Sequence, residues 1–90
     1  MTVAETMRRK LESGFAPLEL TITDESHRHV GHAGARPGGE SHFHVAMVAE
    51  AFAGLGRVER QRRVYAALTE ELAGPVHALA LALRAPGEGQ

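Results

Sequence analysis

Residues 42–83 carry three hydrophobic patterns in succession, and their order constrains the fold more than any other feature of the sequence. Residues 42–48 alternate in the manner of a half-buried strand. Residues 57–73 repeat their apolar positions with helical spacing, and residues 76–83 form an apolar run that suits a further strand. Strands on either side of such a helix run parallel, with a right-handed crossover. The order therefore predicts a β-α-β unit.

Two further patterns precede this unit. Thr2 and Glu5 have the spacing of a capping box, which predicts an N-terminal helix that ends near Gly14. Residues 18–23 alternate between apolar and polar, which predicts a strand that pairs antiparallel with the next strand along the chain. We therefore expect an α+β fold with the order αββαβ, in which a mixed three-stranded sheet has its helices on one face.

The chain has 90 residues, which is enough for one small domain. Residues 1–84 are expected to form that domain and residues 85–90 a flexible C-terminal tail. No apolar run reaches the roughly 18 residues that span a bilayer. The N-terminus lacks the features of a targeting peptide, so we expect a soluble, cytoplasmic protein with no membrane partner. Ten basic and eleven acidic residues exclude a globally basic nucleic-acid binder, although a local basic patch stays compatible with this balance.

Histidine is the most unusual part of the composition, because there are six in all while cysteine is absent. A glycine-rich stretch over residues 24–40 predicts a long loop. That loop carries His27, His29 and His32. Because the last two strands are predicted to be parallel, His77 begins the final strand at the sheet end to which this loop returns. Imidazoles from two distant parts of the chain are thereby expected at one edge.

Two interpretations of these histidines stay open. Neutral imidazole is a ligand for zinc, copper and iron, so the loop histidines and His77 would supply part of a coordination shell. Two histidines leave that shell incomplete, and a third ligand would come from His27 or from another molecule. Alternatively, the loop histidines are solvated and His77 only caps a strand. Likewise, His42 and His44 share one strand face and either bind a metal or line a polar surface.

Four arginines lie near the start of the second long helix. They are Arg57, Arg60, Arg62 and Arg63. Cations at a helix N-terminus oppose the helix dipole, so a compensating anion is expected. That anion is either a nucleic-acid phosphate or a carboxylate of a partner. On a merely solvated face, Glu59 would pair with Arg63 at the favourable i, i+4 spacing.

Several motifs, in their order and spacing, resemble the BolA family over about residues 11–83. They are Asp24-Glu25-Ser26-His27, Gly39-Glu40-Ser41-His42-Phe43, Phe52-Ala53-Gly54, Arg60-Gln61-Arg62-Arg63-Val64-Tyr65, Glu70-Glu71-Leu72 and Val76-His77-Ala78-Leu79. The resemblance implies the αββαβ fold, which is similar to that of type II KH domains. It also implies a role with monothiol glutaredoxins in iron–sulfur cluster trafficking and iron homeostasis.

In that family the two proteins share a [2Fe–2S] cluster. The glutaredoxin and its bound glutathione give thiolates, and the BolA-like protein gives a C-terminal histidine and often a loop ligand. Carried onto this chain, the resemblance assigns these ligands to His77 and to His32 or His29. His32 is favoured because the glycines around it leave its backbone free to reach a partner. Since the chain has no cysteine, no cluster is expected to bind stably to it alone.

Some BolA-like proteins are described as DNA-binding transcription regulators, and the resemblance then makes the arginine-bearing helix the contact element. The sequence Gly31-His32-Ala33-Gly34 lies in the wrong connection for a KH-type grip on nucleic acid. The sequence contains no nucleophile elbow, Walker loop or zinc-protease motif, so no enzymatic activity is expected. A monomer and a weak homodimer both stay open.

Overall fold

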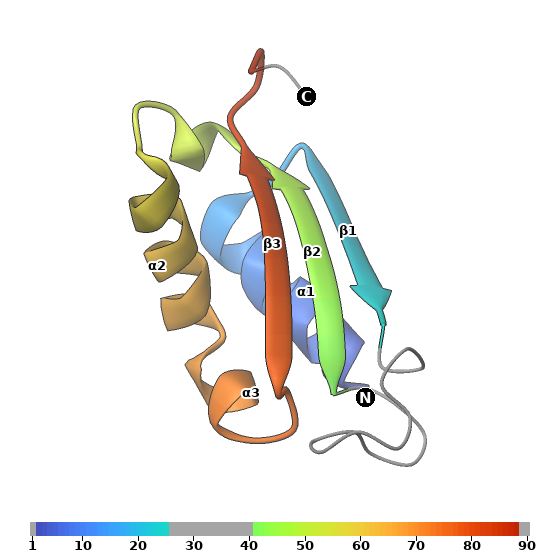
Figure 1. Cartoon of the computed structure of the whole chain (residues 1–90). Coiled ribbons are helices and arrows are strands. Elements are labelled where there is room, and N and C mark those ends of the chain that lie inside the picture. Colours follow the sequence, from blue (N-terminus) through green and yellow to red (C-terminus); the bar gives the residue numbers. More distant parts are fainter. Residues whose placement is uncertain (1, 26–40, 89–90) are drawn as a thin grey trace.

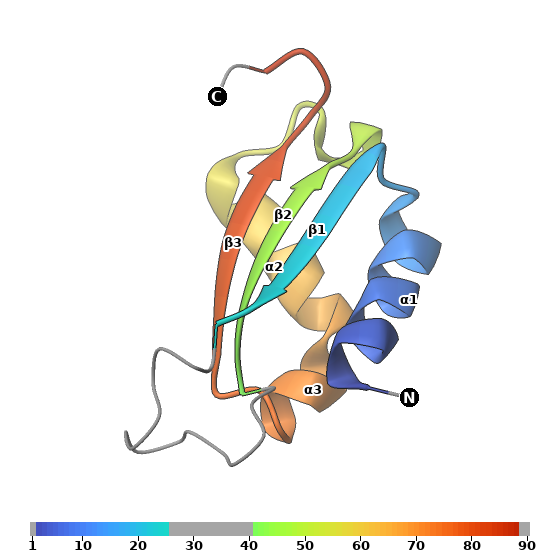
Figure 2. The ribbon, with the colours of Figure 1, turned by 90° about the vertical axis from the view of Figure 1, so that its right-hand side faces the viewer.

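The computed structural model describes residues 2–25 and 41–88. The elements are α1 (Val3–Phe15), β1 (Glu19–Asp24), β2 (His42–Val48), the short 3-10 helix η2 (Glu50–Phe52), α2 (Arg57–Ala67), α3 (Thr69–Ala73) and β3 (Ala78–Arg84). Figure 1 shows the sheet in front of the helices, and in the turned view of Figure 2 the helices again lie on one side of it. The expected α+β architecture with helices on one face is confirmed.

The sheet has the order β1-β2-β3, so β2 is central and the other two strands are edges. β1 pairs antiparallel with β2, and β3 pairs parallel with β2. In this register His44 lies between Thr23 of β1 and Ala80 of β3. The predicted mixed sheet is therefore present, and β2, α2 with α3, and β3 form the expected β-α-β unit.

The N-terminal helix α1 begins at the predicted capping box. The Glu5 N–H donates to Thr2 Oγ1 at 3.0 Å, and the Thr2 N–H donates to Glu5 Oε1 at 2.7 Å. The helix continues beyond Gly14 to Phe15, and Ala16 follows in the left-handed conformation with φ 46°. The predicted end is thus slightly early. The proline that follows Ala16 prevents further helix.

The single helix expected over residues 57–73 is two helices. Leu68 separates α2 from α3, with φ −110° and ψ 25°. The Thr69 hydroxyl lies within hydrogen-bond distance of two backbone carbonyls at the break. The Ala66 oxygen is 2.9 Å away and the Tyr65 oxygen 3.2 Å. Because the side chain of Leu68 is completely buried, the break also serves the packing of the core.

The last strand begins two residues later than predicted. Val76 is buried, and its N–H donates to the Glu71 carbonyl at 2.9 Å, so it closes the turn after α3 instead of pairing with β2. Lys10 of α1 anchors the same turn, because its Nζ lies 2.8 Å from Glu71 Oε2. His77 consequently lies just before β3, at the point where the chain enters the sheet.

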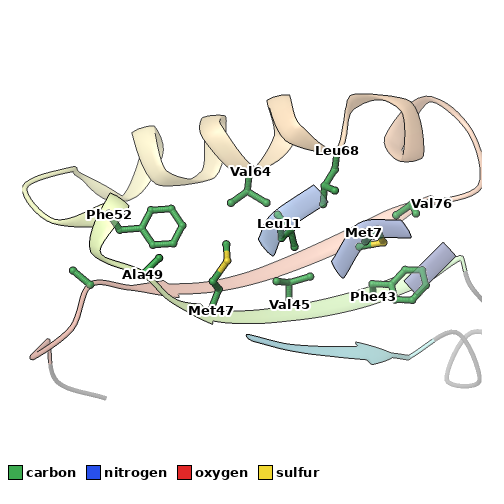
Figure 3. Close-up of a cluster of buried hydrophobic side chains, with 11 residues drawn as sticks. Met7, Leu11, Phe43, Val45, Met47, Ala49, Phe52, Val64, Leu68 and Val76 are labelled. Atoms are coloured by element: carbon green, nitrogen blue, oxygen red, sulfur yellow. The ribbon is translucent and has the colours of Figure 1, made fainter. Parts of the chain in front are cut away.

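The core lies between the sheet and the helices (Figure 3). Its buried hydrophobic side chains are Met7, Leu11, Phe43, Val45, Met47, Ala49, Phe52, Val64, Leu68, Val76 and Ala85. Alternate residues of β2 point into this core, which leaves His42 and His44 on the opposite, uncovered face. Among the described residues, no helix has the length and apolar character needed to cross a bilayer.

Residues 85–88, which belong to the segment expected to be a tail, make several contacts with the rest of the chain. Ala85 is buried, and its N–H donates to Glu88 Oε1 at 2.9 Å. Glu88 also binds the guanidinium of Arg60 on α2. This contact joins residues 28 positions apart, so local sequence patterns carry no sign of it.

Candidate functional site

Three chain segments meet at the lower end of the sheet in Figure 1. The Glu25 N–H, just after β1, donates to the His42 carbonyl at 2.7 Å. The His77 N–H donates to the Ser41 carbonyl at 2.7 Å, which joins the start of β3 to the start of β2. Residues 26–40 connect Glu25 to Ser41. Both ends of that segment are therefore held at the same edge as His77.

Two imidazoles lie side by side at this edge. The ring centroids of His42 and His77 are 6.4 Å apart, and the ring planes differ by 22°. His77 is exposed and His42 is half-buried. The His42 Nδ1 lies 2.9 Å from the Oγ of Ser41, a side chain that is completely buried. The pair thus consists of an accessible imidazole and a neighbouring imidazole that a buried hydroxyl holds.

The structure places His77 where the parallel pairing of β2 and β3 requires it. His27, His29 and His32, the loop histidines of the sequence analysis, lie outside the described residues. His44 is on the uncovered sheet face, two residues along β2 from His42 and opposite Ala80 of β3. The structure therefore brings His42, rather than His44, beside His77.

The donors in the described part of the chain do not complete a metal shell. In residues 2–25 and 41–88, no group of three or more His, Asp, Glu or Cys side chains is close enough to hold a metal ion. The whole chain also lacks cysteine. Imidazole nitrogen is a suitable ligand for iron, so the edge offers part of a shell that ligands from elsewhere would complete.

Neither the burial of Ser41 nor the contact of His42 with His77 was predicted from the sequence. A serine before a strand gives no local sign that its side chain will be buried. The contact with His77 does have a signal in the parallel register, because His42 and Ala78 are the first paired residues of β2 and β3. A predicted parallel pair therefore places the two flanking histidines close together.

The arginines of α2 have different surroundings. Arg60 binds Glu88 through both terminal nitrogens, and its Nε donates to the Leu55 carbonyl at 2.9 Å. Arg62 and Arg63 both approach Glu59, with Arg63 Nε at 3.2 Å from Glu59 Oε2 as the spacing predicted. In the part of the chain that the structure describes, Arg57 makes no ion pair. Arg60, by contrast, is not a free cation, because Glu88 binds it.

The contact between Arg60 and Glu88 shifts the pKa values of both side chains. Hydrogen bonds from Arg60 and from the Ala85 N–H lower the pKa of Glu88 to about 2. The same contact with Glu88 raises the pKa of Arg60 above its ordinary value. Both shifts favour the charged forms, so this ion pair is intact throughout the physiological pH range.

Comparison with known proteins gives consistent matches over nearly the whole chain. The family model for BolA-like proteins matches residues 11–88. The human BolA-like protein 1 is 48% identical over 86 residues, which are 96% of this chain and 60% of the relative. The DNA-binding transcriptional regulator BolA of Escherichia coli is 43% identical over 81 residues, covering 90% of this chain and 73% of the relative. This chain therefore spans well under the full length of some relatives.

Solved structures give the same result. BolA1 from Arabidopsis thaliana superposes with a TM-score of 0.89 and 41% identity, covering all of this chain and 98% of that one. The solution structure of BolA1 from Mus musculus has a TM-score of 0.76 and 45% identity, covering 91% of this chain and 63% of that one. On the family match, the relatives and the shared fold together, the chain belongs to the BolA-like family.

Proposed function

We propose that this chain is a non-enzymatic partner of a monothiol glutaredoxin in iron–sulfur cluster trafficking or iron homeostasis. Its part is to supply histidine ligands to a [2Fe–2S] cluster that the two proteins share. The observation that carries this proposal is the exposed ring of His77, beside His42, at the edge where residues 26–40 begin and end.

The chemistry of the edge fits a shared cluster better than a resident one. The chain has no thiolate, and the described residues hold no three-ligand group, so thiolates from the glutaredoxin and from glutathione must complete the shell. His77 is the ligand from the start of β3, and His32 or His29 is the ligand from the loop. Neutral imidazole in place of thiolate raises the reduction potential of such a cluster. The chain alone binds no stable cluster under this proposal.

The backbone around His77 supports its role as a ligand. The Ser41 carbonyl accepts hydrogen bonds from the N–H groups of His77 and Ala78, at 2.7 and 3.3 Å. This anchor fixes the main chain of His77 against β2 while its side chain stays exposed. A ligand with a fixed backbone loses little conformational entropy on binding, which favours assembly with a partner.

Reconstitution of the full chain tests the proposal. The chain is mixed anaerobically with a monothiol glutaredoxin, glutathione, ferrous iron and sulfide, and the visible absorption and circular dichroism of the complex are recorded. His77→Ala is expected to weaken or alter the spectrum, because one iron loses a nitrogen ligand. His32→Ala and His29→Ala then identify the loop ligand, as only one of them should change the spectrum to a similar extent.

His44→Ala is the matched control, since it removes an imidazole from the same sheet but not from the edge. Its spectrum should equal that of the unchanged chain. If His77→Ala also gives that spectrum while its fold is intact, His77 is not a ligand. If the glutaredoxin spectrum is the same with and without this chain, no shared cluster forms.

DNA binding is the second candidate. It is favoured by the name of the Escherichia coli relative and by the exposed arginines Arg57, Arg62 and Arg63 on α2. Phosphate contacts by these side chains would make the affinity fall steeply with salt. Arg60 contributes less to this candidate, because Glu88 already neutralises it.

Affinity for a DNA duplex, measured at several salt concentrations, tests this candidate. The variant Arg57→Ala/Arg62→Ala should bind more weakly and with a smaller salt slope. Arg9→Ala on α1 is the matched control for loss of an exposed arginine elsewhere. Equal affinities for the α2 variant and the control would exclude α2 as the contact element.

A further inference from the structure

We propose that the free edge of β3, with the groove between it and the start of α2, binds an extended acidic peptide segment of a partner protein. The segment adds to the sheet as a fourth strand. This site lies toward the end of the sheet that is opposite to His42 and His77 (Figure 1). It is therefore separate from the proposed cluster site and does not depend on it.

The backbone of β3 has one side without a strand partner. The Ala78 N–H donates to the backbone carbonyl of Ser41, just before β2, at 3.3 Å, and the Arg84 carbonyl accepts from the Ala49 N–H, just after β2, at 3.0 Å. Residues of a strand alternate in the direction of their backbone groups. Ala78, Ala80, Ala82 and Arg84 therefore turn these groups toward β2, and the leucines between them turn theirs to the free edge.

The contact of Arg60 with β3 agrees with this assignment. Its Nη1 donates to the Leu83 carbonyl at 3.4 Å, and α2, which carries Arg60, lies on the side of β3 away from β2 (Figure 1). Nearer the start of β3, no residue of the segments 2–25 and 41–88 bonds to the outward backbone groups of Leu79 and Leu81. Unpaired groups along an edge are a template for a further strand.

A groove runs beside this edge. It has a volume of about 470 Å³ and lies between Leu81–Leu83 on one side and Arg57, Arg60 and Gln61 of α2 on the other. A peptide in such a groove pairs its main chain with the edge strand and contacts the helix through its side chains. The arrangement of an edge strand beside a helix therefore suits an extended segment.

Charge identifies the chemistry of that segment. The charged residues that line the groove are Arg57 and Arg60, and the lining contains no acidic residue. Glu88 of the chain itself places a carboxylate on Arg60, which shows the kind of group that the rim accepts. Arg57 is exposed and has no such partner among the described residues. A carboxylate of the added segment would pair with it.

A second copy of this chain fits less well through the same edge. β3 has the sequence ALALALR, so pairing of two β3 strands brings no carboxylate to Arg57. The acidic edge strand of a second copy is β1, with Glu19 and Asp24. Pairing of β1 with β3 is head-to-tail and would give open-ended assemblies unless the rotation closed a ring.

Binding of a model peptide tests the proposal. The probe is a fluorescein-labelled octapeptide of alternating threonine and glutamate, and fluorescence anisotropy reports its binding to the full chain. The control probe is an octapeptide of alternating threonine and lysine. We expect saturable binding of the acidic peptide that is at least tenfold tighter than that of this control. Arg57→Glu should weaken it at least tenfold. Arg62→Glu, an equal charge change outside the groove lining, should change it by less than threefold.

Amide hydrogen exchange shows whether the peptide adds as a strand. Saturation with the acidic peptide should slow exchange of the Leu81 N–H at least tenfold, while the Ala80 and Ala82 N–H groups, already paired with β2, change little. Binding without protection of Leu81, or no saturable binding, would overturn the proposal. Protection of Leu81 in the free chain, with self-association in sedimentation experiments, would make a second copy the occupant and overturn it as well.

Discussion

Arg60 and Glu88 form a two-pronged ion pair, with Nη1 at 2.7 Å from Oε1 and Nη2 at 2.6 Å from Oε2. Glu88 Oε1 also accepts the Ala85 N–H, and Arg60 Nε donates to the Leu55 carbonyl. These contacts join residues 85–88 to the start of α2. An arginine that the sequence suggested for nucleic-acid or partner contact is thus an internal anchor for the C-terminal residues.

This ion pair makes stability depend on pH in the acidic range. The pKa of Glu88 is about 2 in the folded chain, against an ordinary value of 4.5. Because the folded pKa is depressed, the stabilisation is complete above about pH 5 and is lost as pH falls from there toward 2. Glu88→Gln should therefore lower the free energy of unfolding at pH 7 and have much less effect at pH 2.

Urea unfolding followed by circular dichroism at the two pH values measures this difference. Glu12→Gln is the control, because it removes only an exposed contact of 3.6 Å with Arg8. Its effect at pH 7 should be smaller than that of Glu88→Gln. An equal loss of stability by Glu88→Gln at pH 7 and pH 2 would contradict an electrostatic origin.

The core predicts a large difference between two leucines. Leu11 of α1 is completely buried against the sheet, whereas Leu18 is 64% exposed. Leu11→Ala should lower the free energy of unfolding by about 2–5 kcal/mol, because it removes buried methyl groups and leaves a cavity. Leu18→Ala should change it by no more than about 0.5 kcal/mol. Denaturant unfolding of both variants measures these values, and similar losses would contradict the packing described.

The first turn of α1 predicts a smaller effect. Thr2→Ala removes the acceptor for the Glu5 N–H at the N-terminus of the helix. The expected loss is about 1 kcal/mol in the free energy of unfolding. Thr2→Ser keeps the hydroxyl and should restore most of that stability. If serine and alanine at this position are equally destabilising, the hydroxyl does not cap the helix.

Local patterns predicted the features that depend on neighbouring residues. The capping box of Thr2, the bounds of β2 and the contact of Glu59 with Arg63 all follow from spacing along one element. The parallel pairing of β2 and β3 follows from the helical connection between the two strands, and this pairing places His77 at the edge where β2 begins. The capping box, the bounds of β2 and the contact of Glu59 with Arg63 need no information about distant parts of the chain.

Features that depend on tertiary packing were not predicted. The break at Leu68 reflects burial of that side chain between the helices and the sheet, while the sequence around it has helical spacing. The partner of Arg60 lies 28 residues away, on a segment without periodicity. Ser41 is completely buried at the point where its carbonyl accepts the N–H groups of His77 and Ala78, residues far from it in the sequence. In each case a polar or apolar side chain takes its role from a contact that spacing does not encode.

The hydrogen bond of Ser41 with His42 gives the final prediction. Ser41 Oγ is buried and lies 2.9 Å from His42 Nδ1, and the ring of His42 faces that of His77. Ser41→Ala removes this partner, so the His42 ring should sample more orientations, and the free energy of unfolding should fall by about 1 kcal/mol. Because the rings are neighbours, the imidazole resonances of both His42 and His77 should shift in NMR spectra.

Thr23→Ala, an exposed change on the same sheet, should leave the His77 resonances in place. If Ser41→Ala moves neither ring's resonances, the hydroxyl does not position the pair. If it moves them and the reconstituted cluster also decays faster, the buried serine acts on the site through His42.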